Sequence, residues 1–126
     1  MKKILIVDDE LYIRQIYFRL LLESGYSVCW AKDATQATNI IIRESIDLIL
    51  LDIKMPGIDG RVMFDIIRQY NPSLKVIVSS VYPIEKQKKM IPSGVDYYFD
   101  KSEGPFCLLE KVKACLSTMD HCEVYS

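Results

Sequence analysis

The stretch Ile46–Gly57 (IDLILLDIKMPG) decides the fold of this chain. Its centre is a short, almost unbroken apolar run, which is typical of a strand buried on both faces of a sheet. Pro56 and Gly57 follow closely and are expected to end the strand. Asp52 therefore lies at the carboxyl end of a buried strand, and this is the edge at which open α/β sheets bind their ligands.

Four other apolar runs resemble this strand, and a helical pattern follows each of the five. The other strands are expected at Ile4–Val7, Tyr26–Trp30, Leu74–Val78 and Val95–Phe99. Helices are expected at about 11–24, 34–44, 59–70 and 84–91, with a last one beginning at Pro105. Five alternations predict an α/β, flavodoxin-like, doubly wound fold, (βα)5, with a five-stranded parallel sheet, five helices and right-handed crossovers.

Composition limits the class of protein. The chain has 126 residues, of which 50% are hydrophobic, and its formal net charge is -1. One compact domain is expected, at residues 1–120, with a short tail at 121–126 and fraying from about Ser117. The charge does not favour direct binding of nucleic acid. No apolar run approaches the roughly 20 residues of a membrane span, and no signal peptide is recognised, so we expect a cytoplasmic protein without a membrane contact.

The four cysteines show no close C-x-x-C pairing, so neither a zinc site nor a redox motif is expected. Cys29, Cys107 and Cys115 are expected to be reduced thiols with the role of small buried hydrophobic residues. His121 lies beside Cys122 near the end of the chain and is expected to be solvated.

Charged and hydroxyl side chains follow four of the predicted strands. They are Asp8 and Asp9, Asp52, Ser80, and Lys101. Because parallel strands point the same way, these residues share one edge of the sheet. Three neighbouring carboxylates repel one another and require either a proton or a cation. Mg2+ prefers oxygen ligands and retains waters, so it is the expected cofactor of this edge.

The same residues fit the transfer of a phosphoryl group to a carboxylate. Lys101 can pair with Asp52 and then with the oxygens of a phosphoryl group, and the hydroxyl of Ser80 can donate to the same oxygens. Metal and lysine together would offset the negative charge during transfer. The set therefore predicts a phosphoacceptor site.

The motifs at these strand ends resemble the receiver domain of bacterial two-component response regulators. They are ILIVDDE at 4–10, DLILLDIKMPGIDG at 47–60 and GVDYYFDK at 94–101. The resemblance implies that Asp52 is the phosphorylated residue and that Lys101 is the family's lysine. It also implies that Asp8, Asp9, Asp52 and the backbone carbonyl of Lys54 hold Mg2+.

The resemblance further implies a signalling mechanism. A histidine kinase or histidine phosphotransfer protein would donate the group to Asp52, and Ser80 would then move inward together with the switch aromatic, Tyr98. The face made by the fourth helix, fifth strand and fifth helix would change and control an effector protein, with a phosphorylation-dependent dimer as a further outcome. Such a protein assists only its own phosphorylation and dephosphorylation. Because the chain ends after this segment, we expect a stand-alone phosphoacceptor switch in a two-component system or phosphorelay.

Two positions depart from the family pattern. Val81 stands where the family has Ala or Gly, so its branched side chain is expected to slow phosphorylation, dephosphorylation or both, and a Val81→Ala variant tests this. Ser102 stands where many members have proline, so a cis bond after Lys101 is not assumed.

Three other classes of protein also place an aspartate or a ligand site at this edge of the fold. A haloacid-dehalogenase-like, Mg2+-dependent phosphatase would need a second acid two residues after the nucleophile, where this chain has Lys54. A flavin-binding protein would need a phosphate-binding loop after the first strand, where Asp8 and Asp9 would repel phosphate. A receiver-like scaffold that is never phosphorylated is disfavoured by the complete set of acids and lysine.

Overall fold

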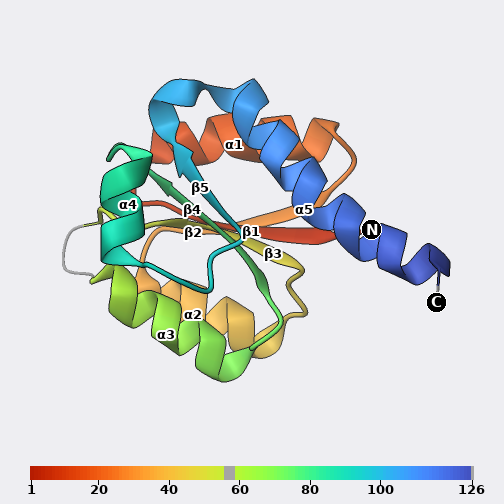
Figure 1. Ribbon diagram of the computed structural model, residues 1–126, viewed down its shortest axis with the longest axis horizontal. Coiled ribbons are helices and arrows are strands. Elements are labelled where there is room, and N and C mark those ends of the chain that lie inside the picture. Colours follow the sequence, from red (N-terminus) through yellow and green to blue (C-terminus); the bar gives the residue numbers. More distant parts are fainter. Residues whose placement is uncertain (56–58, 126) are drawn as a thin grey trace.

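The computed structural model describes residues 1–55 and 59–125, and only the backbone of residues 118–125. Within this part, five parallel strands form one sheet in the order β2-β1-β3-β4-β5 (Figure 1). The strands are β1 (Lys3–Val7), β2 (Ser27–Ala31), β3 (Leu48–Asp52), β4 (Lys75–Ser80) and β5 (Tyr97–Asp100). The helices are α1 (Leu11–Glu23), α2 (Ala34–Arg43), α3 (Gly60–Tyr70), α4 (Ile84–Met90) and α5 (Pro105–Tyr125), with a short 3-10 helix, η1 (Lys101–Glu103). The predicted α/β fold is confirmed.

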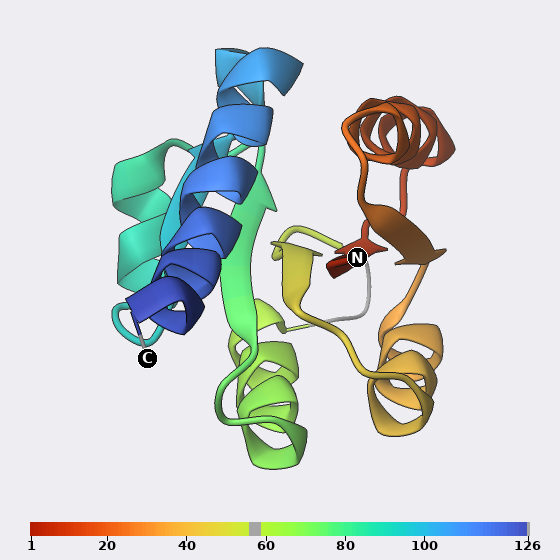
Figure 2. The same cartoon turned by 90° about the vertical axis from the view of Figure 1, so that its right-hand side faces the viewer.

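Helices cover both faces of the sheet (Figure 2), and a hydrophobic core lies on each face. Leu5 and Val7 of β1 pack in the core on the side of α2 and α3, whereas Ile4 and Ile6 pack on the side of α1 and α5. Successive side chains of a strand point to opposite faces, so a strand covered on both sides must be apolar throughout. This explains the unbroken apolar runs in the sequence.

The sheet order brings the ends of β1 and β3 together. β1 lies between β2 and β3, so the chain leaves β1 on one side and returns on the other. In the register of the parallel pair, Val7 is opposite Leu51. The next residues, Asp8 and Asp52, therefore lie side by side at the point where doubly wound sheets bind ligands.

Local signals set the starts of α2 and α3. The side chain of Asp33 accepts a hydrogen bond from the backbone N–H of Gln36, and that of Asp59 accepts one from the N–H of Arg61. Both caps satisfy donors that a helix start leaves free. Asp33 with Gln36 three residues later is a sequence pattern that predicts a capping box. The Gln36 side chain accepts from the backbone N–H of Lys32, so the box takes a variant form.

The structure also corrects several expectations about single elements. The helical spacing of Val62, Met63, Ile66 and Ile67 predicts a buried face on α3, but Val62 is exposed and Phe64 is buried with Met63 and Ile67. The backbone of α5 is helical to Tyr125, beyond the expected fraying at Ser117, because neither Gly nor Pro interrupts the sequence after Pro105. The expected strand stop at Pro56–Gly57 lies outside the described residues, as do the side chains of His121 and Cys122.

Among the described cysteines, Cys115 is buried while Cys29 and Cys107 are half-buried, and all three are free thiols. In the described residues, no helix combines the length and apolar character that crossing a bilayer would require.

Candidate functional site

The site is centred on an ammonium group between two buried carboxylates. Lys101 Nζ lies 2.7 Å from Asp8 Oδ2 and 3.2 Å from Asp52 Oδ2. Both aspartates are 2% exposed. The sequence predicted the pair with Asp52, and the structure adds the closer pair with Asp8. One cation therefore balances two acids that burial would otherwise destabilise.

Backbone groups fix the second oxygen of each buried carboxylate. The N–H of Glu10 donates to Asp8 Oδ1 at 2.9 Å, and the N–H of Lys54 donates to Asp52 Oδ1 at 2.9 Å. Each carboxylate is thus held by its own loop on one side and by Lys101 on the other. Its position is set before any ligand arrives.

Burial dominates the protonation of the site. It raises the pKa of Asp52 to about 6, although Lys101 and the Lys54 N–H favour the charged form. Asp8 raises the pKa of Asp52 further by its negative charge. For Lys101, burial disfavours the charged form, but the hydrogen bond to Asp8 and the charges of Asp52 and Asp8 outweigh it and raise the pKa. The metal-free site therefore holds excess negative charge that a cation would relieve.

A third acid completes a potential cation site. Asp8, Asp9 and Asp52 each offer a carboxylate oxygen, and these oxygens lie within 4.8 Å of one another. Asp9 is exposed, unlike the other two, so one side of the cluster is open to solvent. Oxygen donors with room for water are what Mg2+ prefers. The residues present fit that ion.

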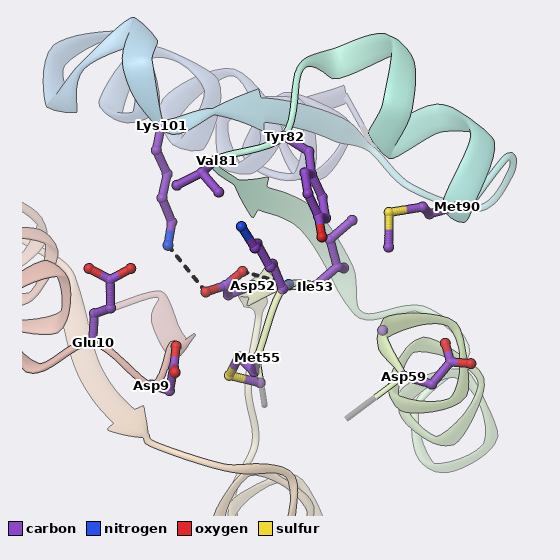
Figure 3. A pocket seen from close by; sticks show the side chains of 12 residues that line it. Asp9, Glu10, Asp52, Ile53, Met55, Asp59, Val81, Tyr82, Met90 and Lys101 are labelled. Atoms are coloured by element: carbon purple, nitrogen blue, oxygen red, sulfur yellow. Dashed lines mark hydrogen bonds and ion pairs between the residues drawn. The ribbon is translucent and has the colours of Figure 1, made fainter. Parts of the chain in front are cut away.

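The acids and the lysine line an open cavity of about 1000 Å3 (Figure 3). Its walls come from the loops after β1, β3 and β4 and from α3, α4 and η1. The lining residues are Asp9, Glu10, Asp52, Ile53, Lys54, Met55, Asp59, Gly60, Val81, Tyr82, Met90 and Lys101. Lys101 extends into this cavity toward Asp52, which lies at its base (Figure 3).

The predicted hydroxyl, Ser80, is the last residue of β4 and is fully buried. Its Oγ accepts a hydrogen bond from the backbone N–H of Tyr82 at 3.1 Å. Val81, in contrast, lines the cavity and is 52% exposed. The branched side chain identified from the sequence therefore lies on the path to Asp52.

Tyr98, the predicted switch aromatic, lies in β5 and is not among the residues that line the cavity. Its hydroxyl donates to the carbonyl oxygen of Ile91, which follows α4. Lys111 of α5 donates to the backbone carbonyl of Tyr98 at 3.0 Å. Tyr98 thus connects β5 with the end of α4, on the face for which the sequence predicted a change.

Local caps position Lys101 without the proline of the family pattern. Asp100 accepts hydrogen bonds from the backbone N–H and hydroxyl of Ser102, and the Glu103 side chain accepts one from the Asp100 N–H. This capping box starts η1 at Lys101. No peptide bond between described residues is cis, so the chain passes Ser102 in the trans form.

Sequence reasoning missed two buried polar side chains near the site. Arg14 of α1 donates to the backbone carbonyl of Asp8 at 2.8 Å and lies over the ring of Trp30 at 4.7 Å. Gln87 of α4 donates to the backbone carbonyls of Tyr82 and Phe99. Helical spacing alone places Gln87 on a turn of α4 but does not show that it faces the sheet.

Comparisons with known proteins agree with this geometry. The sequence model of one protein family, the response regulator receiver domain, matches residues 4–113 of this chain. The chain is 33% identical to the transcriptional regulatory protein YxdJ of Bacillus subtilis over 114 residues, which are 90% of this chain and 50% of that protein. It is 36% identical to the sporulation initiation phosphotransferase F of the same organism over 81 residues, covering 64% of this chain and 65% of the relative. The chain thus spans half to two thirds of these relatives.

Solved structures give the same result. A CheY-like receiver domain protein from Methanospirillum hungatei superimposes with a TM-score of 0.88 at 31% identity, covering 96% of this chain and 98% of that one. The response regulator TrrA of Thermotoga maritima, solved with Mg2+ and beryllium fluoride, gives 0.82 at 35% identity, with coverage of 91% and 99%. These findings give no support to the phosphatase alternative.

Proposed function

The chain belongs to the response regulator receiver domain family, and on that premise we propose that Asp52 is its phosphoacceptor, receiving a phosphoryl group from a partner's phosphohistidine. The observation that carries this proposal is the ammonium of Lys101 between the buried carboxylates of Asp8 and Asp52. Family membership alone does not make a site active. Here the carboxylate that would accept the phosphoryl group (Asp52), the cation that would pair with its oxygens (Lys101) and a neighbouring acid that could hold a metal ion (Asp8) lie together.

In the proposed transfer, an oxygen of the Asp52 carboxylate attacks phosphorus while the bond from phosphorus to the donor breaks. The N–H of Lys54 holds the other oxygen of Asp52, which fixes the direction of the attacking one. Lys101 stays within reach of Asp52 and pairs with the oxygens of the incoming group. Ser80 donates its hydroxyl to the same group after a movement of the loop that follows β4.

We assign Mg2+ to Asp8, Asp9 and Asp52, whose carboxylate oxygens lie close together, and by resemblance to the family also to the backbone carbonyl of Lys54. The ion would supply positive charge against the phosphoryl oxygens during transfer. TrrA was solved with Mg2+ and beryllium fluoride, which supports the same ion here.

The partners follow from the same proposal. Receiver domains interact with histidine kinases or phosphotransfer proteins and with effectors, and we assign this chain a donor and an effector of these kinds, acting in the cytoplasm. The face of α4, β5 and α5 would transmit the signal, through an effector or a phosphorylation-dependent dimer. No separate enzymatic activity is assigned beyond the chain's own phosphorylation and dephosphorylation.

Incubation with Mg2+ and acetyl phosphate tests the proposal. Mass spectrometry should show one added phosphate on the wild type, which does not form when Mg2+ is left out of the reaction and is absent in Asp52→Asn. Asp47→Asn is a matched control, because Asp47 lies at the opposite end of β3 and its carboxylate accepts from the N–H of Lys3. A phosphate that persists in Asp52→Asn, or no phosphate on the wild type, would contradict the assignment.

A further inference from the structure

A polar side chain is fully buried in the helix that borders the site. Gln87 is 0% exposed and is the buried residue of α4, a seven-residue helix whose other side chains include three lysines. Burying an amide is unfavourable unless its polar atoms are hydrogen-bonded. Gln87 must therefore gain its stability from specific bonds.

Both hydrogens of the Gln87 amide nitrogen are used, and they connect two different segments. Nε2 donates to the carbonyl oxygen of Tyr82 at 2.7 Å and to that of Phe99 at 2.9 Å. Tyr82 belongs to the loop after β4, and Phe99 belongs to β5, two residues before Lys101. Oε1 of Gln87 has no partner among the described residues. We call these two bonds the Gln87 bridge.

The loop that the Gln87 bridge holds is also held at its other peptide group. The N–H of Tyr82 donates to Ser80 Oγ, so Tyr82 is bonded at both its N–H and its carbonyl. Its ring lies 3.9 Å from Lys86 Nζ and 5.1 Å from Lys54 Nζ. A movement of Ser80–Tyr82 toward Asp52 with Gln87 in place would therefore lengthen the bond between Gln87 and the Tyr82 carbonyl.

A second contact connects α4 to β5 independently of the Gln87 bridge. The Tyr98 hydroxyl of β5 donates to the carbonyl of Ile91, which ends α4. β5 is thus bonded to α4 at Gln87, in the middle of the helix, and at Ile91, which follows it, whereas the Gln87 bridge reaches the loop after β4 only through the Tyr82 carbonyl. The Tyr82 bond is therefore the part of the bridge that a movement of the loop would break.

We propose that Gln87 is a positioning residue that holds the loop Ser80–Tyr82 in its resting arrangement through the Gln87 bridge, and that occupation of Asp52 breaks the bond to Tyr82 while keeping the bond to Phe99. This rests on the proposed phosphoacceptor role of Asp52. The cost of breaking that bond opposes the inward movement of Ser80. The resting state is therefore favoured until a phosphoryl group is bound.

Mg2+ with beryllium fluoride, a phosphoryl mimic, tests this by calorimetry. Gln87→Met keeps the length of the side chain without its donors, and Gln87→Leu removes the donors from an apolar side chain of similar volume. Both variants should bind the mimic about fivefold more tightly than the wild type, the size expected for one net hydrogen bond. Ala37→Gly, in the buried face of α2 at the far edge of the sheet, controls for lost stability and should leave the affinity unchanged.

A second measurement needs no substitution. In 15N-labelled wild type, the two amide protons of the Gln87 side chain should both exchange slowly. The mimic should speed the exchange of one proton by about tenfold or more and leave the other protected, because one bond opens. If the exchange of both protons is unchanged, or if the Gln87 variants bind the mimic equally or more weakly than the wild type, the proposed role of the Gln87 bridge in holding the loop is wrong. Failure of the wild type to bind the mimic would instead overturn the phosphoacceptor proposal.

Discussion

At the scale of single residues, the site is organised by burial as much as by charge. Asp8 and Asp52 are almost fully buried at the ends of neighbouring strands, and Lys101 is the cation between them. In this setting the carboxylate of Asp52 is less acidic than usual. The arrangement costs stability in the metal-free protein and leaves the site ready to bind a cation.

The raised pKa of Asp52 predicts how replacing this carboxylate changes the free energy of unfolding at different pH values. The pKa rises from 3.8 to about 6, so the folded state holds the proton more tightly than the unfolded state. Stability from this group is therefore full below about pH 4 and is lost as the pH rises through 6. Asp52→Asn should raise the free energy of unfolding at pH 7, without metal, by on the order of 2 kcal/mol.

Urea unfolding in EDTA at pH 4 and pH 7 measures this difference. The two proteins should differ much less at pH 4, where Asp52 is neutral in the folded state and only partly ionised in the unfolded state. If Asp52→Asn is no more stable than the wild type at pH 7, burial does not raise the pKa of Asp52 as proposed.

At the scale of elements, the close approach of α3 to β3 shapes the floor of the cavity. A Cβ atom on Gly60 would lie 2.6 Å from the Cβ of Ile53 and 3.1 Å from its Cα. Real atoms do not approach this closely, so the start of α3 would have to move away from the residue that follows Asp52. Glycine at the first position of α3 is thus needed for packing.

Gly60→Ala should therefore lower the free energy of unfolding by about 1 to 3 kcal/mol, as overpacking does in other cores. Val62→Ala is the matched control, since Val62 is two residues along the same helix and exposed, and should change stability by less than about 0.5 kcal/mol. Thermal unfolding compares the two. Equal stability of both variants would mean that α3 can move away from Ile53 without a loss of stability.

At the scale of the whole molecule, the sheet connects ligand binding with folding. The three acids come from the loop after β1 and from the end of β3, so their oxygens are within 4.8 Å of one another only in the folded chain. A cation that binds this cluster stabilises the folded state by mass action. Its effect should exceed that of Mg2+ on an ordinary acidic surface.

Saturating Mg2+ should raise the free energy of unfolding by about 2 to 3 kcal/mol at roughly 100 times its dissociation constant. Asp9→Asn should reduce this gain while leaving the metal-free stability within about 0.5 kcal/mol, because Asp9 is exposed. Asp65→Asn, on the exposed face of α3, should retain the full gain. Urea titrations with and without Mg2+ give the comparison, and an equal gain in all three proteins would exclude this cluster as the binding site.

The apolar runs around Asp52 and Asp8 identify their strands in the sequence because a strand covered on both faces must be apolar throughout. Caps such as Asp33 and Asp59 are local as well, so the helix starts could be predicted. The outward side chain of Val62 and the inward side chain of Gln87 could not. Helical spacing gives the relative directions of side chains, and only packing against the sheet selects the inner face.

The sequence by itself determined the alternation of strands and helices and the type of group at each strand end, since both follow from local periodicity. The tertiary structure alone decided that Lys101 pairs with Asp8 as well as Asp52, across 93 residues of chain, and that Gln87 lies between Tyr82 and Phe99. Such contacts depend on the order of strands and the packing of α4 against them. They arise from long-range burial, which no short segment of sequence encodes.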